Sequence, residues 1–417
     1  MKKVIIAGMI GNGLEWYDYA LYGQFAGIIS TLFFPASNAY ISLIQTYGVF
    51  AAGFAMRPIG AILFGFIGDR FGRRLSLAIS ILMMAIPTAL IGFLPTYQKI
   101  GILAPVLLTV MRLVQGLALG GEQSGSLAFI VEHASIKKRG LAGSSSLFSA
   151  VAGILFGGVV GTIAAQLLTP EQLADWGWRV PFIFGVVIGL VGMYIRTKLQ
   201  ESPTYLAAKD EGKLAKKPLY DVFRHHWREL LIGIGIYLSV TVPFYTLVVF
   251  MLSFMVKFLG HSMPEALLMN SISLLVLLPV IPYSAMISDG IGRKPVLMFG
   301  VVSLLVFAYP VFFFLVQPGF VYPFIGHLVF ATAIGVFLGP VSTMLVELFP
   351  TKVRYTGMAL AQNICAAIFG GTTPMVATWM IEKTGSNTII SAYIILCAVI
   401  TIFTLFFFKD KYRLPLH

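Results

Sequence analysis

Charged residues are scarce in this chain, and their scarcity excludes most soluble proteins. Only 11% of the 417 residues are Asp, Glu, Lys or Arg, whereas 58% are hydrophobic, and the mean hydropathy is +0.88. Soluble domains carry roughly 25% charged residues, so these few charges could not cover a water-facing surface of this size. The composition therefore excludes a soluble enzyme and a disordered protein, and it predicts a protein that spans the lipid bilayer.

Cysteine is nearly absent as well, and so are the usual catalytic and metal-binding motifs. Both cysteines, Cys365 and Cys397, lie inside apolar runs, which argues against a disulfide framework or a Cys-based metal site. The sequence contains no His-Glu-x-x-His motif, no phosphate-binding Walker loop and no Gly-x-Ser-x-Gly motif. We therefore expect no metal, no cofactor and no enzymatic activity.

Apolar segments of about 20 residues, the length that a membrane-spanning helix needs, recur along the whole chain. Breaks at charged or Pro/Gly-rich positions predict 12 transmembrane helices, at 4–30, 41–66, 76–95, 101–131, 141–166, 179–197, 229–257, 265–287, 294–316, 321–346, 355–380 and 388–408. Most of the 29 Lys and Arg residues fall on the side that the two termini share. Because basic loops face the cytoplasm, both termini are predicted to be cytoplasmic. The net charge of +12 then follows from topology and does not indicate nucleic-acid binding.

The longest polar stretch, about residues 201–227, separates six predicted spans from the other six. The expected fold is therefore an all-α membrane protein with an N-terminal six-helix bundle at 1–198 and a C-terminal six-helix bundle at 229–417. A cytoplasmic linker at 199–228 would let the two bundles move relative to each other.

Two charged motifs occur once in each half at nearly the same offset, which indicates a tandem repeat. One is an Asp followed by Gly and paired basic residues after the second span of the half, and the other is a Glu and an Arg after the fourth span. Carboxylates at one helix end and guanidinium groups from a neighbour form strong charge-assisted hydrogen bonds, which could hold the cytoplasmic side closed. The candidate gating residues are Asp69, Arg70, Arg73, Glu132, Arg139, Asp289, Arg293, Glu347 and Arg354.

The loop at 68–74 (Gly-Asp-Arg-Phe-Gly-Arg-Arg), with its weaker copy at 288–294, resembles the signature loop of the major facilitator superfamily. Further segments are similar to its metabolite:proton symporter branch: 11–19, 115–116, 120–122, 176–182, 201–203 and 349–354. Carriers of that branch take up proline, betaine, citrate, α-ketoglutarate and related solutes. The resemblance covers nearly the whole chain, and it implies the major facilitator fold, proton-coupled transport and a place in the bacterial inner membrane.

Ionisable residues at membrane depth are costly, so each one is a candidate functional residue. The first half has three such acids, Glu15, Asp18 and Glu122, and two bases, Arg57 and Arg112. One acid is in surplus by this count, and burial favours its protonated form. We expect one of the three, with Glu15 and Asp18 preferred, to carry a coupling proton. The alternative is a static ion-pair network that braces the first bundle, and Arg57 fits that alternative best.

The second half has no charged residue in the middle of any predicted span, so we expect it to supply shape and hydrogen bonds. Aromatic rings could hold an ammonium group by cation–π attraction, and Arg112 could bind the carboxylate of a zwitterion. For any single aromatic residue, ordinary packing or lipid contact is the competing interpretation. The candidate solute-binding residues are Tyr19, Tyr22, Arg57, Arg112, Gln115, Tyr237, Tyr245, Gln362 and Asn363.

Together these patterns predict a secondary active transporter that works by alternating access, a rocking of two bundles around a central site. The expected activity is proton symport that imports a small polar solute, a zwitterion of the proline or glycine betaine type. A di- or tricarboxylate or a metal chelator is the alternative substrate, and export or proton antiport is the alternative direction. We expect a monomer whose partners are the solute, protons and lipid, with no nucleic acid. An ion channel and a membrane enzyme have no supporting motif.

Overall fold

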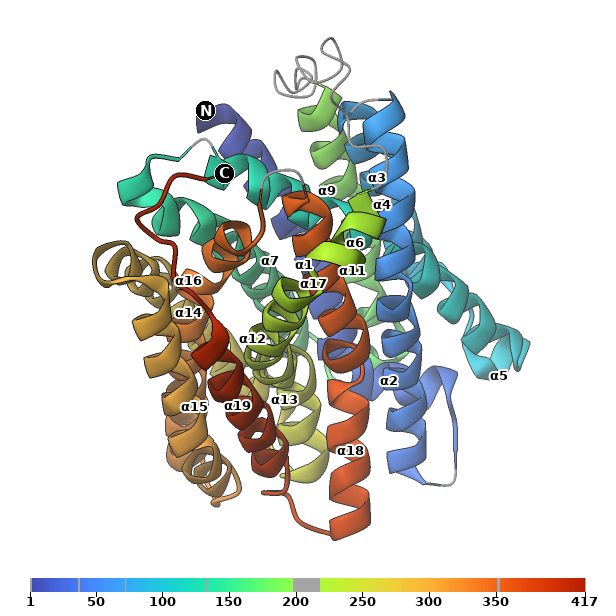
Figure 1. The fold of residues 1–417 in the computed structure, drawn as a ribbon. Helices are drawn as coiled ribbons and strands as arrows, with labels where there is room; N and C mark the ends of the chain where they lie inside the picture. The colour runs from blue at the N-terminus through green and yellow to red at the C-terminus, as the bar shows by residue number, and fades with distance from the viewer. Residues whose placement is uncertain are drawn as a thin grey trace.

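Long helices run side by side through nearly the whole chain (Figure 1). The computed structural model describes residues 2–36, 38–71, 73–132, 134–197, 218–350 and 353–416. Some side chains within these ranges also lie outside the described residues, among them the predicted functional groups of Asp69, Arg70, Arg73, Glu122 and Glu132. The first half comprises α1 (Lys2–Phe33), α2 (Ala39–Ala55), α3 (Arg57–Phe71), α4 (Arg73–Phe93), α5 (Tyr97–Ile100), α6 (Leu103–Glu132), α7 (Arg139–Leu167), α8 (Pro170–Gln172) and α9 (Arg179–Thr197).

The second half begins with a short helix inside the predicted linker and continues with long helices, several of which contain π-helical turns. Its helices are α11 (Pro218–His225), α12 (Trp227–Tyr245), α13 (Met251–Ser253), α14 (Met263–Ile291), α15 (Arg293–Leu315), α16 (Val321–Leu348), α17 (Arg354–Cys365), α18 (Thr373–Thr384) and α19 (Ile390–Phe407). The π-helical turns Thr246–Phe250 and Phe254–Phe258 flank α13, and Ala366–Gly370 follows α17. Such turns occur often at functional sites.

The membrane-spanning character predicted from the sequence is confirmed for most of the chain. Within the described residues, nine helices are long and apolar enough to cross a membrane, or ten if the bent pair Pro170–Gly177 and Arg179–Val191 forms one span. The segment Ile79–Phe93 is a shorter apolar helix. Helix α1, which covers the first predicted span, includes side chains outside the described residues. The full count of 12 spans therefore stays a prediction.

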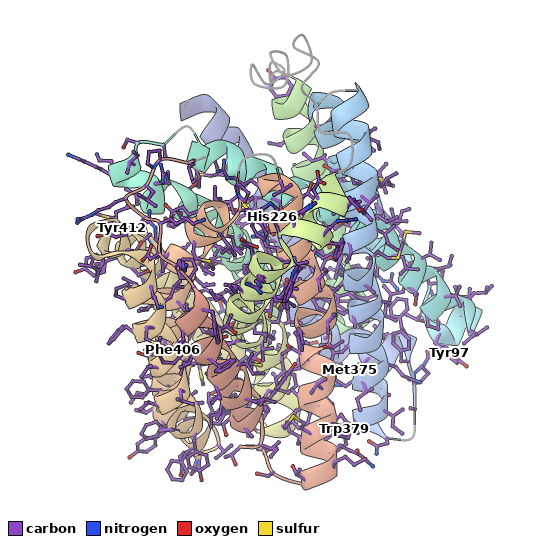
Figure 2. The ribbon with its side chains drawn as sticks, viewed as in Figure 1. Tyr97, His226, Met375, Trp379, Phe406 and Tyr412 are labelled. Atoms are coloured by element: carbon purple, nitrogen blue, oxygen red, sulfur yellow. The ribbon has the colours of Figure 1, made fainter. Side chains whose placement is uncertain are left out.

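The outer surface of the bundle carries large apolar side chains, as a lipid environment requires. Phe406 on α19 and Trp379 on α18 are 69% and 52% exposed, and both are labelled in Figure 2. Water would penalise so much exposed apolar area. This surface therefore agrees with the predicted bilayer contact.

Both ends of the chain lie at the same end of the bundle (Figure 1). We call this the terminal end, and the opposite one the far end. Helix α7 lies between the halves, because it packs on α1 of the first half and on α14 and α16 of the second. The helices α2 and α6 add contacts to α18 and α17, so the interface between the halves is extensive.

Glycine lets helices cross closely around this interface. A methyl group on Gly153 of α7 would collide with the backbone of Gly13 on α1, and one on Gly116 of α6 would collide with Gly53 on α2. Small residues permit this backbone approach in membrane helices. The close crossings thus hold α1 against α7 and α2 against α6.

Candidate functional site

A buried ion pair joins α1 to α6. The carboxylate Oδ2 of Asp18 accepts a hydrogen bond from Nη1 of Arg112 at 3.0 Å, and their side chains are 3% and 1% exposed. The same oxygen accepts from Nε2 of Gln115 at 3.0 Å, and Gln115 also donates to Oγ1 of Thr88 on α4 at 2.9 Å. Three helices of the first half therefore position one carboxylate, and its charge is balanced by Arg112.

The Asp18 network keeps unused hydrogen-bonding capacity. Within the described part of the chain, Oδ1 of Asp18, Nε and Nη2 of Arg112 and Oε1 of Gln115 are buried without a hydrogen-bond partner. An unpaired polar group in a low-dielectric interior is costly, so such a network gains stability when water or a ligand completes its bonds. Oδ1 of Asp18 offers one acceptor for such a bond within the described part of the chain.

Aromatic rings surround the Arg112 guanidinium. Its Cζ lies 3.9 Å from the ring centroid of Tyr22 and 5.6 Å from that of Tyr19, both within cation–π range. The Tyr22 hydroxyl donates to the carbonyl of Thr46 on α2 at 2.9 Å. These two tyrosines contact Arg112, and their predicted contact with the solute stays a prediction.

Glu15 lies one helical turn before Asp18 and is 2% exposed. Glu122, the third acid of the predicted set, has its side chain outside the described residues. The structure thus brings Asp18 and Arg112 together, and it leaves open which of the three acids is in surplus.

Arg57 reaches across to the second half. Its Nε donates to Oδ1 of Asn363 at 3.0 Å, and its Nη1 and Nη2 donate to the Tyr245 hydroxyl at 3.4 Å and to Oε1 of Gln123 at 3.5 Å. Asn363 in turn donates to the carbonyl of Gly120 at 3.0 Å. Among the described residues no carboxylate lies within ion-pair distance of Arg57. Arg57 thus bonds to groups of both halves, and the alternative that it braces the first bundle stays a prediction.

A small cavity lies beside Arg57, between the two halves. Its volume of about 20 Å³ holds roughly one or two water molecules. The predicted residues Arg57, Tyr237, Tyr245 and Gln362 line it, whereas Tyr19, Tyr22, Arg112 and Gln115 do not. The complete lining is Trp16, Arg57, Gln123, Leu147, Tyr237, Val240, Thr241, Phe244, Tyr245, Gln362 and Ala366.

Aromatic side chains form most of one wall of this cavity. Trp16 meets Phe244 edge-to-face at 5.5 Å between ring centroids and lies 6.0 Å from Tyr245. The cavity thus combines aromatic faces, which attract ammonium groups, with one guanidinium, which binds carboxylates. The sequence prediction missed Trp16 and Gln123, and the only available signal was that each directly follows a membrane-embedded acid.

Charged groups close the terminal end. Glu347 on α16 accepts from Nε and Nη2 of Arg293 at 3.2 and 3.1 Å and from Nη1 of Arg139, in the first half, at 3.3 Å. Asp289 accepts from Nη1 of Arg293 at 2.8 Å and from the backbone N–H groups of Gly140 and Leu141 at 2.7 and 3.0 Å. Two carboxylates of the second half therefore hold the first turn of α7.

Arg354 has a different neighbourhood from its predicted partners. Its Nε donates to the carbonyls of Val346 and Phe349 at 3.0 and 3.2 Å, at the end of α16 in its own half. Asp69, Arg70, Arg73 and Glu132, the counterparts in the first half, lie outside the described side chains.

A lysine joins the two halves at the far end. Nζ of Lys257 donates to Oγ of Ser30 on α1 at 2.8 Å, and the rings of Phe258 and Tyr40 lie 5.4 Å apart. Polar contacts thus join the halves at both ends of the bundle.

Comparison with known proteins gives full-length matches. The family model described as "Sugar (and other) transporter" matches residues 3–229 and 221–416. A glycine betaine/proline/ectoine/pipecolic acid transporter of Dickeya dadantii is 34% identical over 425 residues, which cover 100% of this chain and 85% of that protein. A proline/betaine transporter of Salmonella typhimurium is 32% identical with the same coverage.

Solved structures share the fold. The xylose transporter XylE from E. coli, in a partially occluded inward-open conformation, aligns with a TM-score of 0.77 at 20% identity and covers 98% of both chains. A D-xylose–proton symporter aligns with a TM-score of 0.75 at 22% identity, covering 96% of both. At these identities the likeness establishes the architecture alone.

Proposed function

The chain belongs to the sugar (and other) transporter family of the major facilitator superfamily, and from this premise we propose that it is a proton-coupled symporter that imports a small zwitterion. The observation that carries the proposal is the pairing of two separate sites. One is the buried Asp18–Arg112 ion pair, and the other is the cavity that Arg57 shares with aromatic rings. In this proposal the proton is carried inside the first half, and the solute binds in the cavity between the two halves.

We assign the coupling proton to Asp18, with Glu15 and Glu122 as alternative carriers. Protonation of Asp18 removes the negative charge that holds Arg112, at a distance of 3.0 Å. The Arg112 guanidinium then loses its principal partner, which weakens the link between α1 and α6. Release of the proton restores the link. Because the strength of this link depends on the protonation of Asp18, proton binding can shift the equilibrium between two relative tilts of the halves.

The solute's carboxylate is assigned to Arg57 rather than to Arg112. Arg112 is already paired with Asp18, whereas Arg57 lines the cavity and bonds only to neutral groups among the described residues. The ammonium group of the solute would lie against the aromatic wall of Trp16, Phe244 and Tyr245. Relatives named for proline, glycine betaine, ectoine and pipecolic acid support a solute of this kind.

The arrangement disfavours the alternative substrates. A di- or tricarboxylate or an anionic chelator needs several cations, and within the described lining of the cavity Arg57 is the single cationic side chain. One carboxylate and one ammonium match one guanidinium and a set of aromatic faces. The zwitterion is therefore the preferred substrate class.

The remaining parts of the proposal follow the sequence. We place the carrier in the bacterial inner membrane as a monomer with 12 spans, two bundles joined at 199–228 and both termini in the cytoplasm. The terminal end is then the cytoplasmic side. The contacts of Arg139, Asp289, Arg293 and Glu347 serve as the cytoplasmic gate, with Asp69, Arg70, Arg73, Glu132 and Arg354 proposed as the corresponding group around the first repeat.

Uptake into proteoliposomes tests this function. The purified carrier is reconstituted, and labelled proline, glycine betaine, citrate and α-ketoglutarate are offered under an imposed pH gradient, an imposed voltage, or neither. We expect accumulation of proline or betaine when the outside is more acidic. If the rate and extent of uptake depend neither on the pH gradient nor on the voltage, proton coupling is rejected. Accumulation driven by the opposite pH gradient would indicate antiport or export.

A further inference from the structure

Trp16 carries a buried hydrogen-bond donor that no described group accepts. Its side chain is 6% exposed, and its indole Nε1 has no hydrogen-bond partner within the described residues. Tryptophan can only donate, and a buried indole N–H usually finds an acceptor. Trp16 also lines the cavity, so a molecule in the cavity can supply the missing acceptor.

Trp16 and Arg57 are both neighbours of Tyr245 and line the same cavity. The Trp16 ring lies 6.0 Å from the Tyr245 ring, and Nη1 of Arg57 donates to the Tyr245 hydroxyl at 3.4 Å. An acceptor placed in the cavity next to Tyr245 can therefore meet both donors.

The hydrogen bonds of Arg57 leave room for such an acceptor. Among the bonds that Arg57 makes within the described part of the chain, only that from Nε to Asn363, at 3.0 Å, has ordinary length, whereas those from Nη1 and Nη2 measure 3.4 and 3.5 Å. Bonds of that length are weak. The two Nη groups are consequently available to a stronger, ionised partner, and a carboxylate is the anion that a guanidinium binds best.

This inference rests on the proposed transport of a carboxylated solute. We propose that the indole N–H of Trp16 binds the solute's carboxylate together with Nη1 and Nη2 of Arg57, which makes Trp16 a specificity-determining residue. A carboxylate offers about four lone-pair sites, enough for all three donors. An ester or amide of the same solute carries no full negative charge, so it gains much less from these donors. Trp16 thus selects the acids over their esters and amides, which lack the carboxylate.

The chain offers a matched control in Trp178. It is also fully buried, and its Nε1 also lacks a partner within the described residues, but it packs against Phe33 and Phe182 and does not line the cavity. Trp16→Phe and Trp178→Phe therefore remove the same chemical group from two buried sites. Replacement of Trp16 by 3-benzothienylalanine removes the N–H while keeping the ring size, which guards against a folding defect.

The test measures competition for uptake by proline, glycine betaine, citrate and α-ketoglutarate and by their methyl esters in proteoliposomes. A hydrogen bond to a charged group is strong, so we expect Trp16→Phe and the benzothienyl variant to weaken binding of the acid about tenfold or more. The affinity for the ester should hardly change, and Trp178→Phe should keep the acid-to-ester ratio of the unmodified protein.

An unchanged acid-to-ester ratio in both Trp16 variants would overturn the inference while leaving the proposed function intact. An equal loss for acid and ester would also overturn it, because that result would assign Trp16 a packing role. If the unmodified protein bound none of the carboxylated solutes, both the inference and the proposed substrate class would fail.

Discussion

The Asp18–Arg112 pair provides a test that separates proton coupling from static bracing. Its two side chains are almost completely buried and lie 3.0 Å apart. Removing one partner of a buried pair leaves an uncompensated charge and costs about 3–5 kcal/mol. We expect Asp18→Asn and Arg112→Gln each to lower the free energy of unfolding by about that amount. The double variant leaves no orphaned charge, so it should recover most of the loss, and a double-mutant cycle on thermal unfolding in detergent measures this.

Transport distinguishes the two roles once stability has been restored. A symporter that moves one proton with each solute accumulates the solute about tenfold per unit of pH gradient, because one unit corresponds to about 1.36 kcal/mol. The unmodified protein should approach that ratio in vesicles. The double variant should only equilibrate the solute, while it still exchanges labelled for unlabelled solute. Gradient-driven accumulation by the stable double variant, at the original ratio, would refute the assignment to Asp18 and direct attention to Glu15 and Glu122.

The contacts at the two ends of the bundle lead to opposite predictions. Glu347→Gln removes the negative charge that Arg139 reaches across the halves at 3.3 Å and so weakens this contact. A reporter cysteine beneath it should then react about tenfold or more faster with an impermeant thiol reagent supplied from the terminal end. Lys257→Met removes the 2.8 Å bond to Ser30 and should speed labelling from the far end instead. Equal rates from both ends in either variant would contradict the gating roles, and buried Cys365 and Cys397 should contribute little background.

The membrane-spanning character of the chain followed from the sequence because it depends on local patterns. Apolar length determines which segments span a bilayer, and the depth of Asp18 and Arg112 within their segments predicts that they can meet. Gln115 follows Arg112 on the same face of one helix, so the helix period also predicts that it can join the network. The length of a span and the depth of a residue within it can be derived without knowing how the two halves face each other.

Contacts between the halves could not be predicted in this way. Arg57 and Asn363 are 306 residues apart in the sequence. The hydrophobic periodicity of α3 and α17 does not predict which of their faces contact each other. Trp16 and Gln123 are neutral, and each stands beside an acid that dominated the interpretation of its segment. Their place in the cavity depends on how α1 and α6 pack against the second half, which only the folded molecule reveals.

Tyr19 lies between the proton site and the cavity, which suggests how one affects the other. Its ring centroid is 5.6 Å from Cζ of Arg112 and 6.3 Å from the ring of Trp16, which lines the cavity. If protonation of Asp18 releases Arg112, the guanidinium shifts against the Tyr19 ring, and that ring transmits the shift to Trp16. Tyr19→Leu should therefore keep solute exchange but accumulate the solute less than the pH gradient allows. Tyr19→Phe keeps the ring and loses a hydroxyl that has no described partner, so it should stay fully coupled. Equal accumulation by the Leu and Phe variants would show that coupling takes another route.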